Sequence, residues 1–204
     1  MFMKKSFLTL LGLVAISTTA VAQQEVKFGP KAGVNFANLS GVDNADMMTA
    51  FHFGAVAEIK FNEKFSVQPE VVYSAQGYTG DYMIGSSKVA DYTQKLDYVN
   101  VPIMAKYYIV EGFSVEAGPQ VGFLVKAESK FENKEAGVTL TDGDNKDFFK
   151  STDFGLNFGL AYDLPMGVFF GARYNLGLSD IRNNTDSGDA IKNNVIQVGV
   201  GYKF

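Results

Sequence analysis

The last ten residues of the chain alternate between two kinds of side chain. One set is bulky and apolar and ends in aromatic residues: Ile196, Val198, Val200, Tyr202 and Phe204. The other set is mostly small or polar: Val195, Gln197, Gly199, Gly201 and Lys203. Successive side chains of a strand point to opposite faces, so this segment predicts a strand with two unlike faces. A strand that meets lipid on one face and lines a narrow lumen with the other has this pattern.

The same alternation recurs along the chain. It predicts eight strands over residues 27–38, 50–61, 65–76, 96–109, 113–127, 152–162, 168–179 and 193–204. All of them reach the roughly 9–11 residues that a tilted strand needs to cross a bilayer. Strands of soluble proteins average only about 5–6 residues, so the lengths favour a membrane protein.

The segments between the strands alternate in length. Three are short, at 62–64, 110–112 and 163–167, and four are long and polar, at 39–49, 77–95, 128–151 and 180–192. This order places the short turns at one end and the long loops at the other. Outer-membrane barrels have short periplasmic turns and long extracellular loops. The prediction is therefore an all-β fold, a closed eight-stranded antiparallel up-and-down transmembrane β-barrel with four long extracellular loops.

A soluble eight-stranded barrel or a β-sandwich is the alternative, with its apolar face inside and charges in water. Glycines argue against it, because the second face of the strands is crowded with them: Gly29, Gly33, Gly54, Gly118, Gly122, Gly155, Gly159, Gly171, Gly177, Gly199 and Gly201. The second face of segment 152–162 also has no Lys, Arg or Glu. A tight lumen favours small residues, whereas a water-facing exterior needs charge.

The start of the chain has the features of a secretory signal. Lys4 and Lys5 precede a short apolar run at 7–16, and Ala20-Val21-Ala22 provides a small-residue cleavage site. We therefore expect a signal peptide over 1–22 and the barrel over 23–204. An uncleaved anchor is the alternative, but the run is shorter than the roughly 20 apolar residues of a spanning helix.

Composition excludes several functional classes. The chain has no Cys and a single His, so neither a Cys-ligated nor a poly-His metal site is available within it. The net charge of −4 does not favour nucleic acid as a partner. No cofactor and no metal are expected.

Several short motifs resemble a known family. They are Gly-Pro-Lys-Ala-Gly-Val-Asn at 29–35, Val-Gln-Pro-Glu at 67–70, Tyr-Val-Asn-Val-Pro at 98–102, Val-Glu-Ala-Gly-Pro at 115–119 and Gly-Val-Gly-Tyr-Lys-Phe at 199–204. Together they resemble the porin-family outer-membrane β-barrel domain over about 24–204, which is broadly similar to the OmpA and OmpX barrels. The resemblance implies a bacterial outer-membrane location. It also implies insertion by the outer-membrane assembly machinery, which recognises a terminal aromatic strand; Tyr202 and Phe204 match that signal.

The predicted lumen face carries a small set of ionisable residues: Lys31, Glu58, Lys60, Glu70, Lys106, Glu116, Lys126 and Arg173. In a closed eight-stranded barrel the third and seventh strands face each other, so Glu70 and Arg173 are expected to pair. Glu58 and Glu116 would extend this network toward Lys31 and Lys106. Such a barrel is just wide enough for side chains to fill its interior, and charges at that depth must be paired.

These features predict a structural or surface-contact protein with a mostly filled, charge-paired lumen. A narrow porin-like channel for ions or small solutes is the alternative. A lipid-modifying enzyme is a third hypothesis, centred on His52 with Ser74 and Asp153 nearby. The expected partners are outer-membrane lipid, the assembly machinery and an extracellular ligand bound through the loops, and the chain is expected to be a monomer.

Overall fold

The computed structural model describes residues 25–42, 45–84, 87–133, 137–183 and 189–204. The expected signal peptide, 1–22, lies outside the described residues. The strands are β1 (Glu25–Ser40), β2 (Asp46–Lys60), β3 (Phe65–Ile84), β4 (Ser87–Val110), β5 (Phe113–Asn133), β6 (Val138–Asp144), β7 (Thr152–Asp163), β8 (Val168–Gly177) and β9 (Lys192–Tyr202). A short 3-10 helix, η2 (Lys146–Phe148), follows β6. In the described part of the chain, no helix is long and apolar enough to cross a membrane.

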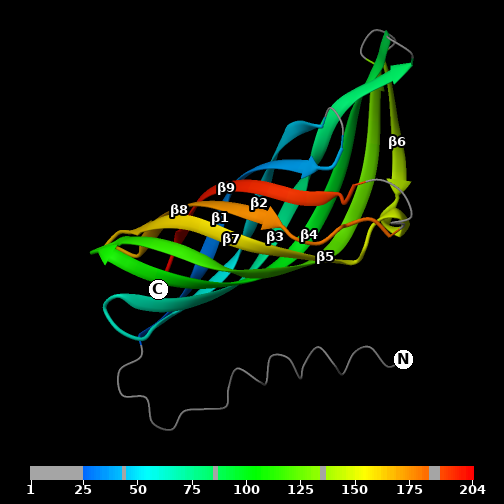
Figure 1. Cartoon of the computed structure of the whole chain (residues 1–204). Helices are drawn as coiled ribbons and strands as arrows, with labels where there is room; N and C mark the ends of the chain where they lie inside the picture. Colours follow the sequence, from blue (N-terminus) through cyan, green and yellow to red (C-terminus); the bar gives the residue numbers. More distant parts are fainter. Residues whose placement is uncertain (1–24, 43–44, 85–86, 134–136, 184–188) are drawn as a thin grey trace, which may run out of the picture.

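Eight of the strands close into a ring. The hydrogen-bonded order is β4-β3-β2-β1-β9-β8-β7-β5, and a further β4–β5 pairing joins the two ends. Neighbouring strands of the ring are antiparallel. The predicted eight-stranded antiparallel barrel is therefore confirmed. The ninth strand, β6, pairs with β5 alone, outside the ring (Figure 1).

The outer surface of the barrel is apolar. On β9, Ile196, Val198 and Val200 are exposed, whereas Gln197 between them is buried inside. Aromatic rings gather at both ends of this surface. Phe53 and Tyr73 lie 5.2 Å apart between their ring centroids near the long-loop end, and Phe61 and Phe65 lie 5.9 Å apart at the short-turn end. An apolar band between two aromatic girdles is the surface expected of a barrel in lipid.

Small residues let the strands pack closely around a narrow interior. A Cβ atom added at Gly118 would lie 1.9 Å from the carbonyl oxygen of Ile103. This distance is too short for any side chain at position 118. Gly77 on β3 has a φ of +134°, a conformation that side chains rarely adopt, and its Cβ position is 1.9 Å from the carbonyl oxygen of Gln94. Glycine at these positions is therefore a requirement of strand packing.

Two of the four long connections differ from the expectation of irregular loops. Segments 77–95 and 128–151 are largely paired strand, because β3, β4 and β5 run beyond the ring and β6 adds to them. We call this extension, residues 79–84, 87–95, 128–133 and β6, the flap; it rises well past the other strands in Figure 1. Its sequence contains four Thr, two Tyr and two Val, residue types that favour strands. The length of these segments and their many Asp, Asn, Ser and Gly residues had suggested loops.

A bulge in β5 corrects one predicted lumen residue. Asp97 pairs with Lys126 and the next residue, Tyr98, pairs with Leu124, so Val125 is the extra residue on β5. The insertion reverses which residues face inward. Lys126 is therefore exposed on the outside, where it bonds to Glu128, and not in the lumen as predicted.

Candidate functional site in the barrel lumen

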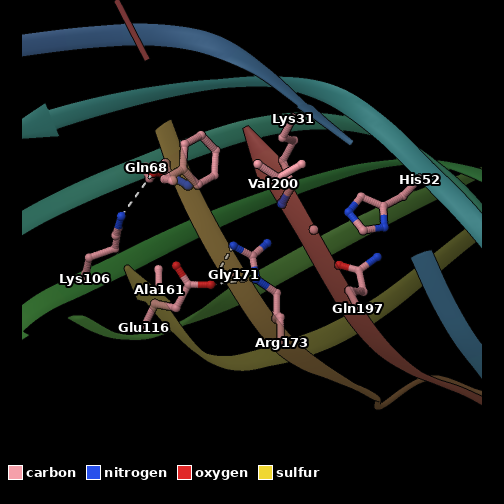
Figure 2. Close-up of a pocket in the computed structure, with 12 residues that line it drawn as sticks. Lys31, His52, Gln68, Lys106, Glu116, Ala161, Gly171, Arg173, Gln197 and Val200 are labelled. Carbon is pink, nitrogen blue, oxygen red and sulfur yellow. Dashed lines mark hydrogen bonds and ion pairs between the residues drawn. The ribbon is translucent and has the colours of Figure 1, made fainter. Parts of the chain in front are cut away.

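Four charged side chains meet at mid-height in the lumen. Arg173 on β8 donates from Nη1 and Nη2 to the two carboxylate oxygens of Glu70 on β3, at 3.0 and 2.9 Å. Its Nε donates to Glu116 on β5 at 2.9 Å, and Lys31 on β1 donates to Glu70 at 2.9 Å. We call Lys31, Glu70, Glu116 and Arg173 the central quartet. Figure 2 shows Arg173 and Glu116 directed toward each other.

The central quartet is electrically balanced, with two cations and two anions. Glu70 has a side-chain exposure of 0%, and that of Arg173 is 6%. Two parallel N–H···O bonds to one carboxylate are both strong and geometrically specific. Removing one member of such a buried pair typically costs about 3–5 kcal/mol, because its partner is left uncompensated. The quartet therefore fixes which strands face each other across the lumen.

A second balanced set lies nearer the short-turn end. Lys203 lies 2.6 Å from Asp163, and Lys106 lies 3.3 Å from Asp163 and 3.8 Å from Glu58. Lys203 also contacts Glu58. We call Glu58, Lys106, Asp163 and Lys203 the basal quartet. The Tyr108 hydroxyl lies within hydrogen-bonding distance of Glu58 and, at 2.7 Å, of Asp163, so its single proton is shared between the two carboxylates.

The expected pairing of Glu70 with Arg173 is present, but the expected single network is divided. Lys31, Glu70, Glu116 and Arg173 form the central quartet, while Glu58 and Lys106 belong to the basal one. Lys60 lies in neither quartet; its Nζ is 4.7 Å from the centre of the Tyr108 ring.

Two members of the basal quartet, Asp163 and Lys203, were missed from the sequence. Lys203 was placed on the small, polar face of its strand but was not linked to the network. The alternation of side chains along β9 was enough to place Lys203 in the lumen, close to the other charged residues. Asp163 was assigned to the 163–167 turn, whereas it is the last residue of β7. Extending the alternation of β7 by one residue would have placed it inside.

A belt of amides and hydroxyls continues the lumen toward the long-loop end. Asn35 donates to the Ser74 hydroxyl at 2.9 Å, and its Oδ1 accepts from Gln197 at 3.0 Å and from His52 at 2.8 Å. Because an amide oxygen only accepts, the Nδ1 of His52 carries a proton. His52 faces the lumen as expected. However, its bonded partner is an amide, and Asp153 bonds elsewhere, to Ser179 and Asn193.

Apolar side chains close the long-loop end of the lumen. Five of them form a cluster in which each is 3% exposed or less: Leu39, Leu96, Tyr98, Ala127 and Ile181. We call these residues the cap. Ile181 is held over the mouth by its backbone, which bonds to Ile191 at 2.9 Å and to Lys150 at 2.7 Å. The sequence did not predict an apolar closure inside a polar lumen.

The hollow beside the central quartet is small. Its volume is about 20 Å³, and its lining includes Lys31, His52, Arg173 and Gln197 (Figure 2). A single water molecule needs roughly 10–15 Å³ on the same measure. This hollow therefore has room for about one water molecule, consistent with a barrel interior filled by side chains.

Several charged residues at the long-loop end are paired with a neighbour. Five basic residues each contact a nearby acid, in the pairs Lys88–Asp81, Lys126–Glu128, Lys130–Glu132, Lys146–Asp144 and Arg182–Asp180. Hydrogen bonds from Arg182, with backbone bonds from Arg182 and Ile191, lower the pKa of Asp180 to about 2. Within the described ranges, no three His, Cys, Asp or Glu side chains are grouped to hold a metal ion.

A closed eight-stranded barrel with an apolar exterior and a charge-paired interior defines a small integral protein of the outer membrane. Sequence comparison gives the family: residues 21–183 match the outer membrane protein beta-barrel domain, and the chain belongs to that family. The protein is thus a bacterial outer-membrane β-barrel protein. None of the curated proteins compared with the chain matches it.

Two solved structures share the fold. Ail, the attachment invasion locus protein of Yersinia pestis, is 15% identical, and the match covers 88% of this chain and 99% of Ail with a TM-score of 0.50. Neisserial surface protein A is 16% identical, with coverage of 88% and 99% and a TM-score of 0.53. At these identities the likeness concerns the fold alone. Ail has also been crystallised with the heparin analogue sucrose octasulfate.

Proposed function

We propose that this protein is a structural or surface-contact component of the outer membrane and that its lumen does not conduct. The observation that carries the proposal is the closure of the interior at three depths. The basal quartet, the central quartet and the cap lie one above another, and the hollow beside the central quartet has room for only about one water molecule.

The channel alternative has less support. An ion crossing the central quartet would have to separate Arg173 from Glu70 or Glu116, with which it makes short, buried bonds. Each disruption exposes an uncompensated charge in a narrow, poorly hydrated space. The cap adds an apolar barrier, and hydrophobic constrictions exclude water and ions.

The enzyme alternative also lacks its required geometry. A hydrolytic site built on His52 needs a group that orients the ring and a hydroxyl within reach of its other nitrogen. In the structure Asn35 takes the orienting position, and Ser74 bonds to Asn35. We therefore propose that His52 braces the polar belt and has no catalytic role.

The long-loop end is the proposed contact surface, since binding residues are commonly placed on segments held by a rigid scaffold. We do not extend polyanion binding from Ail to this chain. Five of its outer basic residues are each paired with an acid, so a sulfated ligand would have to compete with those acids for them. The barrel is proposed to be monomeric and to be inserted by the assembly machinery through Tyr202 and Phe204.

The proposed mature chain begins after residue 22. Intact-mass measurement of protein purified from outer membranes tests this point directly. A mass corresponding to residues 23–204 supports the proposal, and a mass that retains the first 22 residues overturns it.

Single-channel recording of the refolded protein in a planar bilayer tests the closed lumen. A heat-modifiability gel on the same sample confirms that the barrel is folded, and an open porin serves as the positive control. We expect no stable openings from the folded barrel. Reproducible openings that disappear when the barrel is unfolded would overturn the proposal.

A further inference from the structure

The flap has one apolar face. Cross-strand partners point to the same side of a sheet, and the register pairs Tyr82 with Ala90, Tyr92 with Phe131, Phe131 with Leu140 and Asn133 with Val138. The opposite face carries charges, including Asp81, Asp91, Lys130 and Glu132. Leu140, Val138 and Tyr82 on the apolar face remain 65%, 48% and 47% exposed.

An aromatic row connects this face to the barrel. The ring of Tyr82 lies 5.4 Å from that of Phe131, Phe131 lies 4.9 Å from Tyr92, and Tyr92 lies 5.6 Å from Tyr78. Tyr78 in turn packs against the cap. Because each ring packs against the next, the row forms a preformed apolar surface that is continuous with the cap.

Bilayer lipid does not reach this face. Tyr82 is nine residues beyond Tyr73, which belongs to the outer aromatic girdle. At a rise of about 3.3 Å per residue this is roughly 30 Å along the strand. With a tilt of about 45°, Tyr82 stands on the order of 20 Å above the girdle. The apolar face is thus presented outside the hydrocarbon region.

The face is hollowed at the outer part of the flap. A hollow of about 500 Å³ is lined by seven residues: Tyr82, Val89, Ala90, Phe131, Asn133, Val138 and Leu140. We call it the trough. A second hollow of about 360 Å³ shares Tyr82 and Phe131 with the trough and leads toward the barrel mouth. The trough has no charged residue in its lining.

We propose that the trough binds a small uncharged molecule that is apolar or aromatic. Two observations select this occupant. The volume lies within the roughly 300–1,000 Å³ typical of small-molecule sites, which are concave, mostly apolar and largely preformed. The uncharged lining also matches an uncharged ligand, because a charged group placed there would lose its hydration without gaining a partner.

A second copy of the chain fits less well. A stable protein interface involves about 20–30 residues on each side, whereas seven residues line the trough. This site is independent of the closed lumen, so the two proposals succeed or fail separately.

The test uses the full-length barrel refolded in nanodiscs, with its Val and Leu methyl groups labelled for NMR. The probe is 2-naphthol, which is uncharged at pH 7, and 2-naphthalenesulfonate is the charged control with the same rings. We expect 2-naphthol to shift the methyl signals of Val89 and Val138 in a saturable manner. The sulfonate should bind at least tenfold more weakly.

Matched variants locate the site. Leu140→Asp places a charge in the trough, while Thr139→Asp places the same charge on the opposite face of the same strand. Leu140→Asp should weaken 2-naphthol binding at least tenfold, and Thr139→Asp should leave it unchanged. Both positions are exposed, so the barrel should stay folded in each variant.

Four outcomes overturn the proposal. They are shifts that do not saturate, equal binding of the two probes, equal effects of the two variants, and methyl signals that change with protein concentration instead of with the probe. The last outcome would show that a second copy covers the trough.

Discussion

The guanidinium of Arg173 on β8 donates hydrogen bonds to both carboxylate oxygens of Glu70 on β3, at 3.0 and 2.9 Å, from the opposite wall of the barrel. The two residues are 103 positions apart in the chain. No backbone pairing joins β3 to β8. This pair, with Lys31 and Glu116 beside it, is therefore a direct brace across the lumen.

Replacing Arg173 with Met should destabilise the folded barrel strongly. Glu70 and Glu116 would then share only Lys31, and breaking a buried pair in this way costs about 3–5 kcal/mol. The measurement is the midpoint of urea unfolding in detergent. Lys130→Met on the flap, which breaks an exposed pair, is the matched control and should cost about 0–1 kcal/mol.

Adding Glu70→Gln to Arg173→Met should recover part of the lost stability, because it removes one uncompensated charge. Strictly additive losses in the double variant would show that the two side chains act separately and would contradict the brace.

Tyr108→Phe should lower the free energy of unfolding by about 1.5–3 kcal/mol, the range for a hydrogen bond to a charged group. The change removes the hydroxyl that bonds to Glu58 and Asp163 and leaves the ring in place. Tyr107→Phe is the control, because Tyr107 is exposed on the lipid face one residue away. Equal losses in both variants would show that the basal quartet does not depend on the phenol.

Opening the cap should expose residues beneath it. The chain has no Cys, so a single Ala127→Cys substitution gives a clean reporter at a position that is 0% exposed. We expect this thiol to be inert toward a membrane-impermeant maleimide and to become reactive when Ile181→Gly is added. Leu140→Cys, on the exposed flap, should react in both backgrounds. Fast labelling of the buried reporter thiol with Ile181 in place would refute the closure.

The outer segment around Asp180 should respond to acid. The hydrogen bonds from Arg182 hold the pKa of Asp180 at about 2, below the value of about 3.9 for a free Asp side chain. A depressed carboxyl pKa stabilises the fold above the unfolded value, and this stabilisation is lost as the pH falls toward 2. The protection of the Ile191 amide, which bonds to Asp180, against hydrogen exchange should therefore fall between about pH 4 and pH 2, when its exchange rate is compared with the intrinsic rate at each pH. Arg182→Met should shift that change to higher pH.

The terminal aromatic residue should matter for assembly more than for stability. Phe204 is 77% exposed, so Phe204→Ser removes little native packing inside the barrel. We expect much less of this variant in the outer membrane of cells, with an unchanged unfolding midpoint after refolding in vitro. Normal levels in the outer membrane would remove Phe204 from the assembly signal.

Alternation was enough to predict the barrel, because one face of each strand meets lipid and the other meets a crowded interior. It also placed Glu70 opposite Arg173, since strand count and depth alone decide which residues meet across a closed ring. The flap was not predicted, because its strands are exposed to water and carry many polar and charged residues, a composition that is typical of loops. Lys126 was misplaced because a single inserted residue, Val125, reverses the pattern and has no distinctive sequence.

The cap could not be predicted for a different reason. Ile181 and Leu96 become neighbours only when the outer segments fold over the mouth. Asp163, at the short-turn end, was missed because it lies at the boundary between a strand and a turn and was assigned to the turn.

Lys203 gives the basal quartet a role in the order of events during folding. It lies just past β9, the last strand of the ring in chain order and the one that joins β1 to β8. Until that strand docks, Glu58 and Asp163 have Lys106 as their one quartet cation, and the basal quartet carries an excess of negative charge. Closing the ring and neutralising its interior are thus a single step. In an incomplete or misregistered barrel the basal quartet would have more negative than positive charges. Its charge pairing therefore favours the complete, correctly registered barrel.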